Sequence, residues 1–81
     1  MDKSNNIKAF KTLIENTQDV VGTSASGGNT QYKLVDENDK PLTLNVFDSG
    51  TVQLQGAGEK GTVAESIKLA NKIVNKLEGN R

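Results

Sequence analysis

The sequence predicts an α+β protein in which an antiparallel, curved sheet of three or four strands carries an amino-terminal and a carboxy-terminal helix on one face. Apolar residues recur at spacings of three and four near both ends of the chain. Between these ends, residues 30–55 alternate between apolar and polar side chains, which is typical of strands. With 81 residues there is little room for a second core, so we expect a single small domain over residues 1–81.

The composition narrows the possible functions. Ten basic and ten acidic residues cancel, whereas a duplex-binding module is more often strongly basic. The chain has no cysteine and no histidine, which excludes disulfides, thiolate chemistry and the commonest zinc ligands and general base. No pair of residues suggests a nucleophile with its base. We therefore expect a protein that is not an enzyme and that uses no cofactor and no metal.

The sequence also bears on location. No apolar run approaches the ~18–20 residues that span a bilayer. Residues 1–9 are polar and lack the apolar segment of a secretory signal. We expect a cytoplasmic protein that has no membrane partner.

The first element is an amphipathic helix at about residues 4–16. Its apolar residues share one side at helical spacing, and Ser4 is placed to cap it. These apolar residues are Ile7, Phe10, Leu13 and Ile14. We interpret it as a packing helix, because an interfacial membrane helix would need a larger apolar face and more cations.

Residues 22–29 are small, polar and rich in glycine, and we interpret them as a flexible loop or a hairpin connection. Residues 19–21 could open a short strand before it. A phosphate-binding loop would need a lysine and a following helix, and this segment has neither.

Residues 30–55 predict strands at 30–35, 42–47 and 51–55, joined by turns at 36–41 and 48–50. Leu42, Leu44 and Val46 point to one side, and Thr43, Asn45 and Phe47 point to the other. Val52 and Leu54 are expected to face inward with the first set. The acidic turn at 36–41 lacks the glycine and the distal glutamate of a calcium loop, so we interpret it as a solvated hairpin tip.

The last element is a helix at about residues 62–78. Thr62 and Glu65 form a capping-box pattern, and Gly79 is a plausible stop. The expected buried stripe consists of Val63, Ile67, Ala70, Val74 and Leu77, widened by Leu69 and Ile73. Glycines at positions 56, 58 and 61 would let the chain reverse between the last strand and this helix.

Residues 44–56, which read Leu-Asn-Val-Phe-Asp-Ser-Gly-Thr-Val-Gln-Leu-Gln-Gly, resemble one half-repeat of the TATA-box-binding protein. The helix at 66–77 is similar to the closing helix of that family, and the Ser-Gly…Gln-Gly pattern also resembles the amino-terminal domain of bacterial ribonuclease HIII. The resemblance covers about half of the chain. It implies a TBP-like fold in which the face of the sheet opposite the helices binds nucleic acid.

Carried over position by position, the resemblance implies a nucleic-acid-binding site that consists of Lys33, Thr43, Asn45, Phe47, Gln53 and Gln55. Phe47 matches a phenylalanine that wedges between bases in the TATA-box-binding protein. Amides and hydroxyls can bond to sugar, phosphate or base edges, and an aromatic ring can stack on bases. From the residues alone two alternatives stay open: Phe47 packs beside Tyr32 or in a dimer contact, and the polar side chains form a solvated sheet face.

Three features depart from the family pattern. This chain has one half-repeat where the TATA-box-binding protein has two, and it is expected to open directly on its first helix. Basic residues flanking the face are few, namely Lys33, Lys40 and Lys60. A homodimer, or use beside other domains, would make up for the few phosphate contacts. The rival function is a small protein-interaction or inhibitor protein, of phage or mobile-element type, that docks through the same face or a sheet edge.

Overall fold

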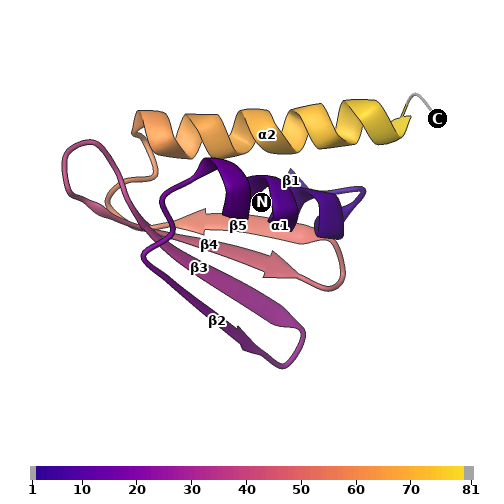
Figure 1. Cartoon of the computed structure of the whole chain (residues 1–81), viewed down its shortest axis with the longest axis horizontal. Coiled ribbons are helices and arrows are strands. Elements are labelled where there is room, and N and C mark those ends of the chain that lie inside the picture. The colour runs from indigo at the N-terminus through magenta and orange to yellow at the C-terminus, as the bar shows by residue number, and fades with distance from the viewer. Residues whose placement is uncertain (1, 80–81) are drawn as a thin grey trace.

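The computed structural model describes residues 2–79 and forms one antiparallel sheet with two helices. The elements follow in the order β1 (Asp2–Lys3), α1 (Ile7–Thr17), β2 (Gly22–Ser26), β3 (Asn29–Val35), β4 (Pro41–Phe47), β5 (Thr51–Gln55) and α2 (Thr62–Gly79). The strand order is β1-β5-β4-β3-β2, and every neighbouring pair is antiparallel. Both helices lie on the same side of the sheet (Figure 1). The predicted α+β class and the one-sided helical layer are confirmed.

The core lies between the sheet and the helices. It contains the inward-facing residues of three strands and the buried faces of both helices: Phe10, Ile14, Tyr32, Leu34, Leu42, Leu44, Val46, Val52, Ala64, Ile67, Ala70 and Val74. The alternation predicted for residues 42–47 is therefore correct for Leu42, Leu44 and Val46. Because both helices cover this inner face, neither covers the outer face of the sheet.

Residues 22–29 differ from the flexible loop expected there. Residues 22–26 form β2, which pairs with β3 along its whole length. Gly27 and Gly28 have φ angles of 54° and 83°, so they make a two-residue hairpin turn that non-glycine residues would adopt poorly. The small residues of this segment suggest a loop because no apolar alternation marks the strand: β2 buries almost nothing, and every position from Thr23 to Ser26 is exposed.

The start of the chain corrects two expectations. A short strand, β1, precedes the first helix and pairs with β5, so the described chain does not open on the helix. The cap of α1 is Asn6, whose side chain accepts a 3.0 Å hydrogen bond from the N–H of Ala9, and Ser4 does not serve as the cap. The N–H of Ser4 instead donates to the carbonyl of Gly50 at 2.7 Å, which extends the β1–β5 ladder.

The amino-terminal end of α2 is capped by a residue distant in sequence. Thr62 is the first residue of the helix, and its N–H and hydroxyl both donate to the carboxylate of Glu37. This arrangement replaces the capping box expected from Thr62 and Glu65. The two hydrogen bonds, that of the hydroxyl first, lower the pKa of Glu37. The turn at 36–41 thus anchors the last helix, and it is more than a solvated hairpin tip.

The stripe predicted for α2 is only partly buried. Ala64, Ile67, Ala70 and Val74 face the core, and Asn71 is buried beside them. Leu69, Ile73 and Leu77 are instead 58%, 48% and 65% exposed, so the prediction that they belong to the buried stripe is wrong. The face of α2 that carries Ala64 and Ala70 packs into the core, and the neighbouring row stays outside.

Within residues 2–79, neither helix combines the length and the apolar character needed to cross a membrane.

Candidate nucleic-acid interface

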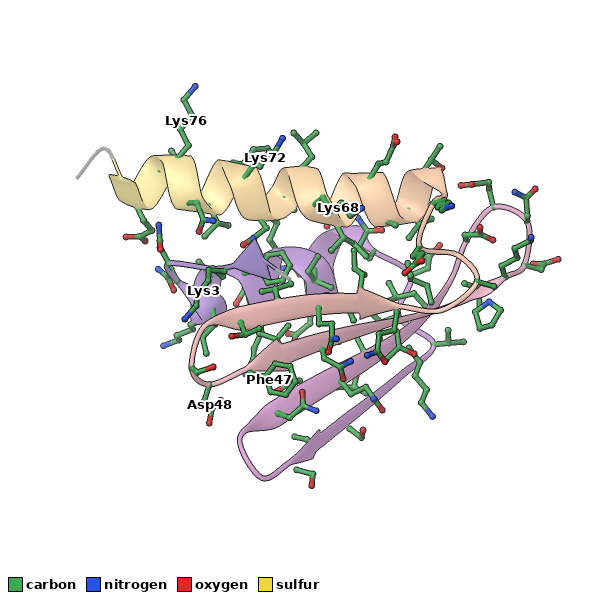
Figure 2. All side chains as sticks on the ribbon, turned by 180° about the vertical axis from the view of Figure 1, so that it is seen from behind. Lys3, Phe47, Asp48, Lys68, Lys72 and Lys76 are labelled. Carbon is green, nitrogen blue, oxygen red and sulfur yellow. The ribbon has the colours of Figure 1, made fainter. Side chains whose placement is uncertain are left out.

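The outer face of the sheet carries all six residues expected to form the site. The pairing registers join Lys33 to Thr43 and Thr43 to Gln55, and they join Asn45 to Gln53. Phe47 ends the same side of β4 (Figure 2). Partners in an antiparallel ladder point their side chains to the same face. The strands therefore bring side chains from positions 33 to 55 into one continuous surface that we call the outer face.

The six side chains differ in how far they are accessible. Lys33 and Gln55 are exposed, at the end of the sheet near the turn at 36–41. Thr43, Phe47 and Gln53 are half-buried. Phe47 therefore presents part of its ring to solvent while the remainder packs on its neighbours, which is the arrangement that a stacking platform needs.

The side chain of Asn45 is buried, although the sequence predicts an exposed amide at this position. It is only 5% exposed although no helix covers it, because it lies on the central strand between Gln31 and Gln53. Its Oδ1 atom accepts a 3.1 Å hydrogen bond from the Nε2 atom of Gln31. Asn45 thus holds Gln31 in place and is not itself free to contact a ligand broadly.

The strand register adds residues that the sequence-based site lacks. Gln31 lies in the row of Asn45 and Gln53, and Ser24 of β2 extends that row to the sheet edge. Asn29 pairs with Phe47, and its buried Oδ1 atom has no hydrogen-bond partner. The side assignment of Gln31 could be derived from its alternation with Tyr32, but β2 carries no such pattern.

Lys3 is a second cation on this face. It pairs with Thr51, whose neighbour Val52 is buried in the core, so the side chains of Thr51 and Lys3 point outward. Figure 2 places Lys3 near Phe47 and Asp48. Lys33 and Lys3 therefore stand at opposite ends of the outer face. Lys40 lies in the turn before β4 and Lys60 in the loop before α2, outside the strand rows.

Comparisons of the chain with protein-family models, with curated proteins and with solved structures found no match. Any functional assignment must therefore come from the surface itself.

Proposed function

We propose that this protein is a non-catalytic module that binds single-stranded nucleic acid on the outer face of its sheet. The observation that carries the proposal is the register, which gathers amides, hydroxyls and one aromatic ring on a sheet face that no helix covers. Such a surface offers stacking through Phe47 and hydrogen bonds to base edges or sugars through Gln31, Gln53 and Gln55.

The charge of the outer face favours a single strand over a duplex. Lys3 and Lys33 are its cations within residues 2–79, which allows about two phosphate contacts, whereas proteins that grip duplex DNA commonly make about 6–10. An unpaired strand exposes its bases, so stacking and amide contacts can replace part of the missing phosphate contacts. The resemblance of residues 44–56 to a TATA-box-binding half-repeat points to the same face.

The test is a fluorescence anisotropy titration at low salt with labelled single-stranded DNA, duplex DNA and an RNA–DNA hybrid. We expect the single strand to bind most tightly, with a log–log salt slope of about −1.4 for two phosphate contacts. Lys33→Gln should reduce the slope by about 0.7. Lys72→Gln makes the same chemical change on exposed α2, on the other side of the molecule, and should leave binding unchanged.

The aromatic contact has its own variants. Phe47→Leu keeps an apolar side chain at this half-buried position but removes stacking, which is worth about 1–3 kcal/mol per base. We expect affinity to fall by about 5- to 150-fold, whereas Phe47→Tyr should bind nearly as the wild type does. Failure of all three probes to bind at low salt would overturn the proposal. If Phe47→Leu binds as tightly as the wild type, the binding site does not include Phe47 on β4.

Protein–protein interaction is the second candidate function, and the exposed row of Leu69, Ile73 and Leu77 on α2 favours it. Isolated exposed apolar residues are ordinary, but three on one helix face mark a typical docking surface. Such binding would depend little on salt and would be lost in Ile73→Glu. Nucleic-acid binding would survive that change, so the two functions can be separated.

A further inference from the structure

A cleft of about 480 Å³ lies between β5 and α2, on the inner side of the sheet edge. One wall consists of residues 52–54 of β5 and the other of Ile67, Lys68 and Asn71 of α2. Glu59 and Lys60 of the connecting loop line it as well. Its lining combines apolar side chains with two cations and one anion, namely Lys60, Lys68 and Glu59.

The edge of β5 beside this cleft is partly unpaired. Among residues 2–79, β1 pairs with Thr51 and Val52 only. The N–H of Ser4 donates to the carbonyl of Gly50, and backbone groups in an antiparallel strand face alternate sides. The C=O of Gly50 and the N–H and C=O groups of Val52 and Leu54 therefore face this edge, whereas the N–H of Gly50 donates to the carbonyl of Phe47. The N–H and C=O groups of Leu54 meet no strand within the described residues, so they can accept a further extended segment.

Part of this β5 edge is already occupied by an extended segment of the protein itself, β1. β1 lies along β5, and the Nδ2 atoms of Asn71 and Asn75 donate to the carbonyl of Lys3 at 3.0 and 2.8 Å. The cleft lies along the β5 edge beyond the residues that pair with β1, past Val52 in the direction of Gln55. Asn71 thus lies at the boundary between the part of the β5 edge that β1 occupies and the part that is open.

Asn71 also carries an unused acceptor. The residue is 5% exposed, and its Oδ1 atom is buried without a hydrogen-bond partner. Buried acceptors in folded proteins are normally satisfied, and this one is closed to solvent, so Asn71 marks the end of the cleft and the hydrogen bonds to an entering segment must come from β5.

We propose that this cleft binds an extended, acidic segment of a partner protein by strand addition to β5. The segment's backbone pairs with Leu54, and an apolar side chain covers Val52 and Ile67. An acidic side chain lies beside Lys60 and Lys68, whose two positive charges outweigh Glu59. This site shares Gln53 with the outer face, but Ile67, Lys68 and Asn71 of α2 belong to the cleft alone, so Lys68→Glu tests it separately from nucleic-acid binding.

The test is an NMR titration of the isotope-labelled full chain with an acetylated, amidated hexapeptide of alternating valine and glutamate. We expect saturable shifts of the Leu54 amide and of the Asn71 side-chain amide. Lys68→Glu should weaken binding about five-fold or more, since it turns an attraction into a like-charge contact. Lys76→Glu makes the same change two turns along α2, beyond the residues that line the cleft, and should bind as the wild type does.

The charge of the peptide supplies the complementary control. A hexapeptide of alternating valine and lysine should bind more weakly than the acidic peptide to the wild type, and that order should reverse in Lys68→Glu. Three results would overturn the proposal: no shift at Leu54 with millimolar acidic peptide, shifts confined to the outer face, or equal weakening by Lys68→Glu and Lys76→Glu.

Discussion

The hydroxyl of Tyr32 donates a 2.7 Å hydrogen bond to the Oε2 atom of Glu15, and this bond ties the middle of β3 to α1. Tyr32 is fully buried, while Glu15 lies on the exposed side of the helix. Burial first, and then the bond to Glu15, raise the pKa of Tyr32 well above its ordinary value. The contact adds a polar link between α1 and the sheet beside the apolar packing of Phe10 and Ile14.

Removing this hydroxyl should lower stability. We expect Tyr32→Phe to reduce the free energy of unfolding by about 1–2 kcal/mol, because it removes a hydrogen bond to a charged acceptor. In a domain of this size such a loss lowers Tm by roughly 4–16 °C. Glu15→Gln keeps an acceptor and should cost less. Thermal unfolding followed by circular dichroism measures both, and an unchanged Tm for Tyr32→Phe would contradict the assigned bond.

The raised pKa of this hydroxyl implies that the stability of the protein falls at alkaline pH. Because the folded-state pKa of Tyr32 is raised, its contribution to stability is fully present below the ordinary value of about 10 and is lost as pH rises above it. Tyr32 is the only tyrosine and there is no tryptophan, so tyrosinate absorbance reports this residue alone. We expect ionisation to accompany unfolding. Tyr32→Phe should lose less stability than the wild type over the same alkaline range.

Glu37 predicts the opposite trend in acid. Its pKa is lowered by the hydroxyl and the N–H of Thr62, so its stabilisation is present above about pH 4.3 and is lost as pH falls through the lowered pKa. We expect Glu37→Gln to be less stable than the wild type at neutral pH and to converge with it in acid. Urea unfolding across this range measures the difference.

Gly56 should tolerate no side chain. Its φ is +119°, and a Cβ atom there would lie 2.6 Å from the carbonyl oxygen of Pro41. We expect Gly56→Ala to cost about 3 kcal/mol, from backbone strain together with the displaced β4 backbone. Gly22→Ala is the matched control, since an added Cβ there meets nothing within 4 Å. Equal unfolding midpoints for the two variants would contradict the close approach of the loop to β4.

Two isoleucines on α2 can be used to test which face of that helix packs against the core. Ile67 is 1% exposed and Ile73 is 48% exposed. We expect Ile67→Ala to cost about 2–5 kcal/mol because it leaves a cavity, and Ile73→Ala to cost about 0.5 kcal/mol. Chemical denaturation of both variants gives the comparison. Similar losses would mean that α2 is rotated so that Ile73 packs inward.

Strict alternation made part of the fold predictable. Leu42, Leu44 and Val46 alternate with polar residues on a central strand, and this pattern determined which side faces the helices. The six expected site residues share one face for the same reason. The pattern could not reveal that Asn45 is buried, because cover by Gln31 and Gln53 depends on how separate strands are aligned.

Elements held by long-range partners could not be predicted. β2 has small exposed side chains and exists because its backbone pairs with β3. The cap of α2 comes from Glu37, which is 25 residues away. Leu77 fits the helical period as well as Val74 does, but Val74 is buried in the core and Leu77 is exposed. Each of these outcomes depends on tertiary contacts, which local propensity does not encode.

The exposed hairpin arm of β2 has a consequence for how the molecule opens. The strand is attached by backbone bonds to β3 and has almost no buried side chains, so peeling it away uncovers little apolar surface. Its amide protons should therefore exchange with solvent long before those of β4, at a free-energy cost well below that of global unfolding. β2 is therefore a site of local unfolding, and we expect the rest of the sheet to stay intact when this strand separates from β3.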